Sequence, residues 1–324
     1  MATRIETVWA DSRRLAEIHP LQTGSMKLVH LAPGKPVDLY AGLDEKLRPL
    51  LALRLSKRPP QIRLESDALQ QFRVQRTDGA WQMVLRLERR GLEPVFGRLC
   101  QDLVDAATDM TSESRLLDLF VSRLKLWERL FSYTNDGLLS SGQIRGLMAE
   151  LLVLQRLLQA GKRSAMDVVG GWVGPTGADQ DFVYDDLALE VKSLVPGRVT
   201  VSISSLGQLD CAVPLRLVVV PLASASGSAP GAVSLNGVVA RIEMLVSSDG
   251  AALDLLRSRL LEARYVDHPD YDDQHFVPEE PACFSVGPGF PRLLRGEMSP
   301  GVVEAQYQLG LSALQPFQTP ASLE

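Results

Sequence analysis

The sequence predicts an α/β protein of the α+β kind, in which helices flank a mixed sheet and an N-terminal α/β region comes first. Three observations favour this class. From residue 143 onward the apolar patterns predict helix, strand, strand, strand, helix, strand and helix in that order, which is typical of a mixed sheet with helices packed against it. Residues 81–87 alternate between apolar and polar side chains, and residues 93–133 carry apolar side chains at helical spacing.

The N-terminal region is expected to span residues 1–137. We expect it to be rich in strands over residues 1–92 and helical over residues 93–133. Asp78-Gly79 is a favourable hairpin turn in front of the last strand. The predicted strands lie at residues 28–31, 61–64 and 81–87.

A second domain is expected over residues 138–324, because the polar segments Asn135-Asp136-Gly137 and Ser140-Ser141-Gly142 form a linker. The domain should begin with a helix that ends at Gly161, since glycine is the usual residue after a helix C-terminus. Its predicted elements are a helix at 143–160, a glycine-rich loop at 170–177, strands at 182–184, 187–193, 198–203 and 215–221, a short helix at 204–209, helices at 236–246 and 251–263, a loop at 265–291 and an edge strand at 302–311.

The composition is that of an ordinary folded protein that does not cross a membrane. The 324 residues are 45% hydrophobic and 23% charged, and no apolar run approaches the roughly 20 residues of a membrane helix. Three cysteines lie far apart, without the spacing of a zinc site. An odd number of scattered cysteines suits a reducing compartment. We therefore expect a cytoplasmic protein with no membrane partner.

Charge is distributed unevenly along the chain. The net charge is -5, which argues mildly against a protein that coats nucleic acid. Residues 46–99 nevertheless carry twelve Lys and Arg against five Asp and Glu, a net charge of +7, so the remainder carries -12. Such asymmetry permits a local basic face despite an acidic total. A solvated surface with no binding role explains these arginines equally well.

The most informative segment runs from Asp181 to Ser193 and reads as two short strands joined by a tight turn. Glu190 and Lys192 are two residues apart, so both side chains point to the same face of the second strand. The rest of that strand is apolar, and a charged pair there is costly unless it coordinates something. Asp181 lies nine residues before Glu190, where the first strand begins.

Two carboxylates that converge at strand ends predict a site for a hard divalent cation. Mg²⁺ prefers oxygen ligands and retains several waters, so one or two acids suffice. Asp181 and Glu190 would supply these oxygens, the backbone carbonyl of Val191 would supply a third, and Mn²⁺ could substitute. Lys192 would face the same volume, where it could hold or help deprotonate an attacking water.

Glu150 is a further candidate, because it falls within the apolar stripe of the 143–160 helix. A buried carboxylate without a partner is expensive, and a metal-bound water or Lys192 would remove that cost. Alternatively, Glu150 lies at the boundary of the stripe and reaches solvent or an arginine.

These residues resemble the PD-(D/E)XK nuclease superfamily: an acid on the leading helix (Glu150), an acid that opens the hairpin (Asp181), and Glu190-Val191-Lys192 on its second strand. More narrowly, the chain is similar to the bacterial group called PD-(D/E)XK motif proteins, which are often associated with restriction or defence. That likeness rests on residues 146–150, 172–182, 190–193 and 204–209.

The resemblance implies a restriction-endonuclease-like core that cleaves DNA phosphodiesters with Mg²⁺. It assigns Asp181 and Glu190 as metal ligands, Lys192 as the water-activating residue and Glu150 as an accessory acid. Gln208 matches a glutamine that some relatives place near the site, although a helix-surface amide is an equally good explanation for it.

Two features depart from the simplest form of the motif. Gln180 stands where proline often precedes the metal-binding acid. Asp179 competes with Asp181 for the role of that acid. Asp181 is favoured because it directly adjoins the apolar run that begins at Phe182.

Two hypotheses on function follow. The first is a Mg²⁺-dependent endonuclease of a bacterial restriction or phage-defence system, with DNA as its partner and a homodimer as a possible assembly. The second is a non-catalytic or partner-activated DNA-binding subunit of a larger complex that contains a helicase, ATPase or methyltransferase. The acidic total charge favours the second hypothesis, because phosphate binding would then depend on a partner. The intact set of acids and lysine favours the first.

Overall fold

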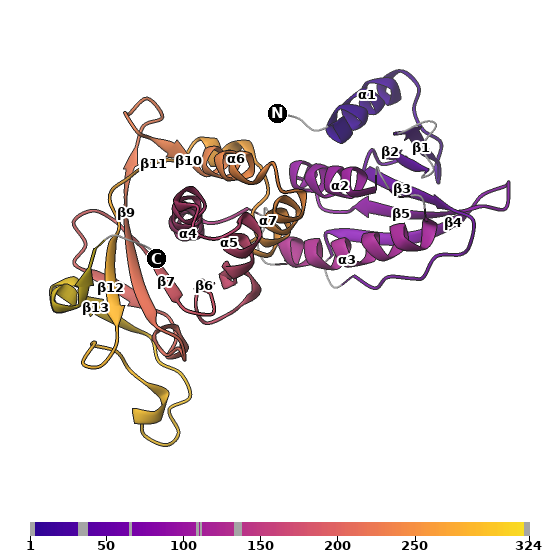
Figure 1. Cartoon of the computed structure of the whole chain (residues 1–324). Coiled ribbons are helices and arrows are strands. Elements are labelled where there is room, and N and C mark those ends of the chain that lie inside the picture. Colours follow the sequence, from indigo (N-terminus) through magenta and orange to yellow (C-terminus); the bar gives the residue numbers. More distant parts are fainter. Residues whose placement is uncertain are drawn as a thin grey trace. The chain divides into compact units, whose positions relative to one another are not determined.

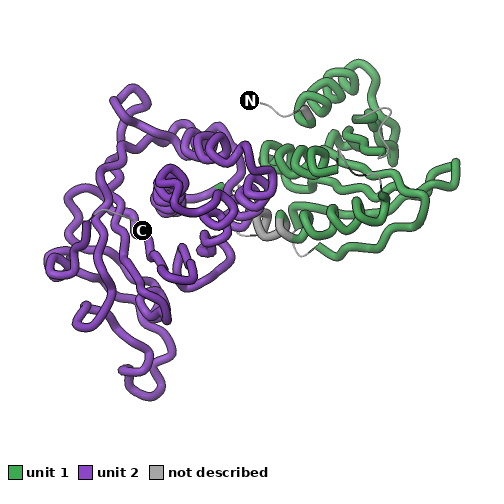
Figure 2. The backbone as a smooth tube through the Cα atoms, viewed as in Figure 1, with its two compact units in different colours: residues 1–138 green, residues 139–324 purple. Residues whose placement is uncertain are grey.

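The computed structural model describes residues 4–31, 38–64, 67–107, 110, 112–132 and 138–320. The chain divides into two compact units, residues 1–138 and residues 139–324 (Figure 2). The predicted linker segment Asn135-Asp136-Gly137 lies outside the described residues. The mixture of helices with several sheets confirms the predicted α+β class. In the described part of the chain, no helix combines the length and the apolar character needed to cross a membrane.

Unit 1 is a five-stranded antiparallel sheet with helices before and after it in the sequence (Figure 1). Its elements are α1 (Arg4–Ile18), β1 (Met26–His30), β2 (Leu39–Asp44), β3 (Pro49–Leu55), β4 (Leu69–Gln75), β5 (Trp81–Leu87), α2 (Glu93–Ala107) and α3 (Glu113–Ser132). The spatial order of the strands is β1-β2-β3-β5-β4.

The first helix is held in unit 1 by aromatic packing. Trp9 of α1 stacks on Phe96 of α2 with ring centroids 5.2 Å apart. Its indole N–H donates a hydrogen bond to the carbonyl of Leu50 on β3 at 3.1 Å. A fully buried aromatic pair with a satisfied indole contributes strongly to a core. This contact links α1 both to the sheet and to α2.

The strand predictions for unit 1 are partly confirmed. The hairpin between β4 and β5 turns at Asp78-Gly79, where Gly79 adopts φ 85 and the Asp78 carboxylate accepts the N–H of Ala80 at 3.1 Å. The predicted strand at residues 61–64 is wrong, because these residues form no ladder. The helix α1 and the strands β2 and β3 were not predicted from the sequence.

Unit 2 contains a seven-stranded mixed sheet and a separate two-stranded sheet (Figure 1). Its helices and strands are α4 (Ser141–Ala160), α5 (Ala165–Gly171), β6 (Phe182–Val183), β7 (Ala188–Leu194), β8 (Thr200–Ile203), β9 (Leu215–Ala225), β10 (Val233–Ser234), α6 (Leu235–Val246), α7 (Gly250–Glu262), β11 (His275–Pro278), β12 (Ala282–Val286), β13 (Tyr307–Gly310), α8 (Leu311–Leu314) and β14 (Gln318–Thr319). Short 3₁₀ helices cover Gly174–Thr176, Gly207–Leu209, Pro269–Asp272, Arg295–Glu297 and Gln315–Phe317.

The sheet of unit 2 is built around β9. The strand β7 pairs with β9 in parallel, whereas β11 and β12 pair with it antiparallel. The short strand β6 pairs with β7 as the predicted acidic hairpin. Helix α4 packs against β7 and α6. Parallel pairing of two strands that are not adjacent in sequence places the hairpin beside the central strand of the sheet.

Helix α4 follows the sequence signals at both of its ends. Ser140 accepts a hydrogen bond from the N–H of Gln143, and the side chain of Gln143 accepts the N–H of Ser140 in return. This reciprocal capping box defines the helix start. Gly161 adopts φ 66 at the other end, as predicted for a residue that ends a helix. The buried side chains of α4 include Leu147, Leu151 and Leu154 of the predicted stripe.

Two loop predictions for unit 2 are wrong in part. The 170–177 segment begins inside helix α5, whose residue Gly171 lies against the ring of Tyr184, where a Cβ would collide with it. Glycine is therefore used for close packing in a helix and not for flexibility. The 265–291 segment contains β11 and β12, and β12 lies directly beside β9. The tail strand β13 pairs only with β8, as an edge strand would.

Candidate active site

The hairpin strand β7 brings Glu190 and Lys192 together, as their spacing predicts. The Nζ atom of Lys192 lies 2.6 Å from Oε1 of Glu190. Glu190 is completely buried, whereas the Lys192 side chain retains 15% exposure. Parallel pairing with β9 places both residues opposite an apolar strand, at Leu217 and Val219. The pair therefore lies in a largely apolar environment, in which charges are weakly screened.

Glu190 lacks the hydrogen bonds that a buried carboxylate normally receives. Apart from the ammonium group of Lys192, 2.6 Å from Oε1, no group of the described residues donates a hydrogen bond to either of its oxygens. Burial raises the pKa of Glu190 well above its ordinary value, the negative charge of Asp181 raises it further, and Lys192 opposes the shift. An ionised carboxylate in this position needs an additional cation.

Asp181 is fixed by the backbone around it. Its Oδ2 accepts a hydrogen bond from the N–H of Val191 at 2.7 Å, and its carbonyl accepts the N–H groups of Val173 and Gly174. A Cβ on Gly174 would lie 2.8 Å from Oδ1 of Asp181, so this close approach requires glycine. Burial raises the pKa of Asp181 to about 6, while the Val191 hydrogen bond and Lys192 act in the opposite direction.

The structure places the competing acid Asp179 elsewhere. Its carboxylate lies against Gly207, where a Cβ would collide with it. Gln180, at the position of the family's proline, is buried and donates a hydrogen bond from Nε2 to the carbonyl of Gly207 at 2.7 Å. Gln180 therefore ties the start of the hairpin to the 3₁₀ helix Gly207–Leu209.

Glu150 reaches the same group of charges from α4. Its Oε2 accepts a hydrogen bond from the indole N–H of Trp172 at 2.9 Å, and Trp172 is completely buried. Burial raises the pKa of Glu150 to about 8, and the charge of Asp181 adds to the rise; Trp172 and Lys192 oppose it. An indole is thus one partner of Glu150, whose side chain is only partly buried.

Gln208 contacts the lysine of the pair. Its Oε1 accepts hydrogen bonds from Nζ of Lys192 at 3.1 Å and from the N–H of Ser204 at 2.7 Å. The hydroxyl of Ser205 accepts the N–H of Gln208 at 3.3 Å. The amide is therefore fixed by the loop before it and directed at the ammonium group, and it is no helix-surface amide. Lys192 is held between Glu190 and Gln208.

A cavity of about 320 Å³ opens beside Glu150 and Asp181. Arg264 also lines it, with the unusual φ of 62. The N–H of Arg264 bonds to the carbonyl of Leu261, and that of Tyr265 to the carbonyl of Leu260, which is the Schellman arrangement that normally carries glycine at the position of Arg264. Sequence reasoning missed Arg264. The only available signal was a non-glycine residue directly after a helix end, which is weak.

The donor set fits a hard divalent cation, although no three His, Cys, Asp or Glu residues of the described chain lie close enough together to hold a metal among themselves. Mg²⁺ needs only one or two protein carboxylates. Two features favour such an ion. The carboxylate of Glu190 is buried with Lys192 as its partner, and the acids of the site outnumber this one lysine. In an extended strand the N–H and C=O of one residue point to the same edge. The carbonyl of Val191 therefore lies on the edge that faces Asp181.

Comparison with known proteins identifies the family of the chain. A family model described as a "putative PD-(D/E)XK family member" (DUF4420) matches residues 12–312. No curated protein and no solved structure matches the chain. The matched region includes most of unit 1 and nearly all of unit 2. Because the match covers well over half of the sequence, the chain belongs to this PD-(D/E)XK family.

Proposed function

We propose that this protein is a Mg²⁺-dependent endonuclease that hydrolyses DNA phosphodiester bonds in a bacterial restriction or phage-defence system. Membership of the PD-(D/E)XK family supports a nuclease.

One observation carries the proposal: Glu190 is fully buried, and among the described residues its carboxylate has no donor other than the ammonium group of Lys192 at 2.6 Å. A group that served only stability would be better replaced by an apolar residue, because a buried ion pair seldom repays its desolvation. The neighbouring acids Asp181 and Glu150 make the electrostatic cost larger. Such a cost is typical of a site that is shaped for a ligand.

In the proposed mechanism, Asp181 and Glu190 would hold the metal ion, and the carbonyl of Val191 would serve as a third ligand. When bound, the ion supplies Lewis acidity and a nucleophilic water at neutral pH. Lys192, held by Gln208 and Glu190, orients the attacking water and stabilises the charge that develops on the phosphate. Glu150, anchored by Trp172, accepts a hydrogen bond from a water of the site.

The test is cleavage of supercoiled plasmid DNA with Mg²⁺ or Mn²⁺ by purified wild-type and variant proteins. Asp181→Ala and Lys192→Ala should abolish nicking while the thermal unfolding transition is retained. Asp179→Ala is the matched control, because it removes a neighbouring acid that contacts the Gly207 turn; it should nick like the wild type. Wild-type cutting by both site variants would contradict the proposal.

The net charge of -5 favours a second candidate, a DNA-binding subunit that is active only within a larger complex. A protein with an acidic total depends more on a partner for phosphate contacts. Nicking by the purified chain supports the endonuclease. Cleavage that requires an added helicase, ATPase or methyltransferase supports the subunit.

A further inference from the structure

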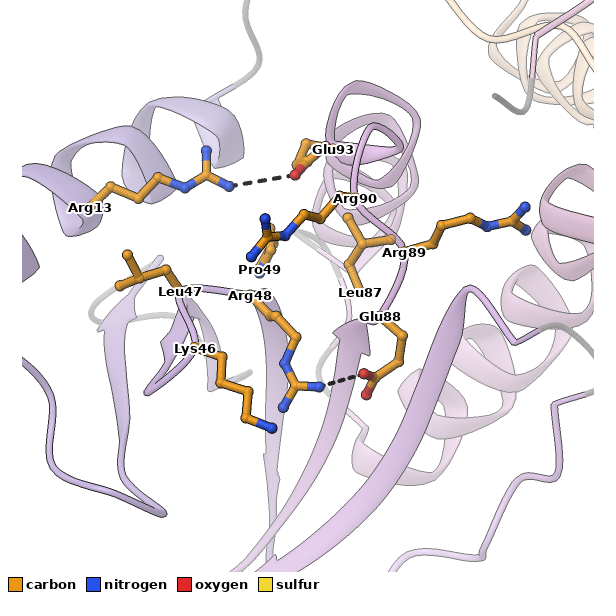
Figure 3. A pocket seen from close by; sticks show the side chains of 10 residues that line it. All are labelled: Arg13, Lys46, Leu47, Arg48, Pro49, Leu87, Glu88, Arg89, Arg90 and Glu93. Carbon is orange, nitrogen blue, oxygen red and sulfur yellow. Dashed lines mark hydrogen bonds and ion pairs between the residues drawn. The ribbon is translucent and has the colours of Figure 1, made fainter. Parts of the chain in front are cut away.

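A second pocket, of about 220 Å³, lies within unit 1 and is lined mainly by cations (Figure 3). It is formed by the turn between β2 and β3 together with the segment that joins β5 to α2 and one residue of α1. Five cationic and two acidic side chains line it. The cations are Arg13, Lys46, Arg48, Arg89 and Arg90, and the acids are Glu88 and Glu93.

The base of the pocket is a rigid ion-pair network. Asp44 is 1% exposed, and its Oδ1 accepts the backbone N–H groups of Lys46 at 3.0 Å and Arg48 at 2.9 Å. Its Oδ2 lies 2.7 Å from the guanidinium of Arg48, which also pairs with Glu88. Arg48 is thus neutralised by two acids. Its role is to fix the turn rather than to bind a ligand.

Two other cations lack this neutralisation. In the part of unit 1 that the structure describes, the side chains of Lys46 and Arg90 have no acidic partner. Arg13 has only a long contact of 3.8 Å with Glu93. Figure 3 shows Arg90 extending toward Arg13, whereas Arg89 points away from both. The pocket therefore carries a surplus of positive charge at its mouth and not at its base.

The backbone of the turn adds a second observation. Leu47, between Lys46 and Arg48, adopts φ 58 and is 40% exposed. A non-glycine residue in this left-handed region is strained, and such strain concentrates at functional sites. The turn thus presents Lys46 and an exposed leucine to solvent at an energetic cost. A turn that served only chain reversal would carry glycine at this position.

We propose that this pocket binds a phosphate group of the DNA backbone through Lys46 and Arg90, with Arg13 in support, so that unit 1 holds the substrate that unit 2 cleaves; this rests on the proposed function. A phosphodiester is an anion, so it can bind cations that no acid of the pocket neutralises. Phosphate contacts of this kind position proteins on DNA. Lys46, Leu47 and Arg90 are all exposed. This open rim suits a polymer backbone better than a small ligand, which would be mostly enclosed.

The test is binding of a fluorescent 30-base-pair duplex to the full chain, measured by anisotropy in EDTA so that no cleavage occurs. Lys46→Gln with Arg90→Gln should weaken binding about tenfold and make the dependence of log K on log salt shallower by about two units. The matched control is Lys57→Gln with Arg63→Gln, which removes two exposed cations outside the pocket and should change affinity by less than about twofold. Equal affinities for the two double variants would overturn the proposal.

Competition separates DNA from other phosphate sources. Duplex DNA should displace the probe, whereas 10 mM inorganic phosphate or nucleoside triphosphate should not. Displacement by the triphosphate at micromolar concentration would assign the pocket to a free nucleotide and contradict the proposal. If the pocket variants lose DNA binding but the wild type never nicks DNA, the nuclease function fails and the phosphate site stands. If the wild type nicks DNA and the pocket variants bind normally, the phosphate site fails alone.

Discussion

The acid cluster of unit 2 and the cationic pocket of unit 1 treat charge in opposite ways. In unit 2, Glu150, Asp181 and Glu190 share Lys192; burial raises the pKa of each acid, and the charge of Asp181 raises the pKa of Glu150 and of Glu190 further. In unit 1, acids such as Asp44 are matched by arginines, and the surplus is cationic and exposed. The first group of side chains therefore carries excess negative charge, and the second carries excess positive charge. Under the proposed function, this difference divides chemistry and substrate holding between the units.

One backbone feature is common to both pockets. Leu47 and Arg264 are the non-glycine residues with positive φ in the described parts of the chain, one in each unit, and each lines a pocket. Leu47 lies at the tip of a hairpin, and Arg264 lies directly after the end of α7. Glycine would fit either position with less strain. Backbone strain of this kind is concentrated at functional sites.

The largest difference between the pockets should appear in the rate of cleavage. Asp181→Ala and Glu190→Ala should each lower the single-turnover rate at saturating DNA by about 10³-fold, since each removes a proposed metal ligand. Lys46→Gln with Arg90→Gln should leave this rate within about twofold and change only the DNA concentration needed for saturation. If the double variant slowed the rate at saturating DNA as strongly as Asp181→Ala, the proposed division of roles between the units would be contradicted.

The sequence predicted the chemical side of this comparison better than the binding side. The two-residue period of a strand was sufficient to place Glu190 beside Lys192, and Gly161 was recognised as the residue that ends α4. The basic segment 46–99 was recognised as a charge asymmetry. Which of its cations are neutralised depends on Asp44 and Glu88, and these pairs form only when β2, β3 and β5 assemble.

The failures follow from tertiary structure as well. The strand β12 was hidden in a segment rich in Pro, Gly and Asp, because it is only five residues long and is stabilised by pairing with β9. Gly171 suggested a loop, but it allows the ring of Tyr184 to pack on a helix. Arg264, near the end of α7, lines the cavity beside Glu150 and Asp181. The local sequence around Arg264 gives no sign that it lies close to these two acids.

A smaller effect should come from Gln208, which acts through Lys192. Gln208→Ala should lower the cleavage rate between about 10- and 100-fold, as loss of a residue that orients an active group does. In a Lys192→Ala background the same substitution should have no further effect, because the pair acts as one unit. Rate measurements on the four proteins of this cycle provide the check. Additive losses would show that Gln208 acts independently of the lysine.

The stability of the metal-free protein should depend on pH through the acid pocket. The pKa of Glu150 is raised from 4.5 to about 8 in the folded state, so folding favours its protonated form. Its contribution is fully present below pH 4.5 and is lost as the pH rises through 8. Glu150→Gln should remove this loss, and at pH 8 it should stabilise the protein by on the order of 2 kcal/mol relative to the wild type.

Urea unfolding in EDTA at pH 5 and pH 8 measures this effect. Asp254→Asn on α7 is a suitable control, because this substitution also removes one acid but lies outside the pocket. The same loss of stability from pH 5 to pH 8 in wild type and Glu150→Gln would contradict the assigned pKa.

The smallest effects should come from the two strained residues. Leu47→Gly and Arg264→Gly should each raise the free energy of unfolding by about 0.5–1 kcal/mol, since relief of left-handed strain exceeds the added entropy of the unfolded chain. Arg264→Gly should also slow cleavage, because the side chain lines the acid pocket. Denaturant unfolding and plasmid cleavage measure the two consequences separately. Loss of stability in both glycine variants would show that neither position is strained.

The central claim is that Asp181 and Glu190 hold a divalent metal ion beside Lys192. Its most direct test is a crystal structure of the wild-type chain soaked in Mn²⁺, with the ion located by anomalous scattering. The account predicts one strong peak at about 2.1–2.2 Å from carboxylate oxygens of both Asp181 and Glu190. The account would be contradicted by an anomalous peak that lies away from both carboxylates. It would equally be contradicted if saturating Mn²⁺ gave no peak between them.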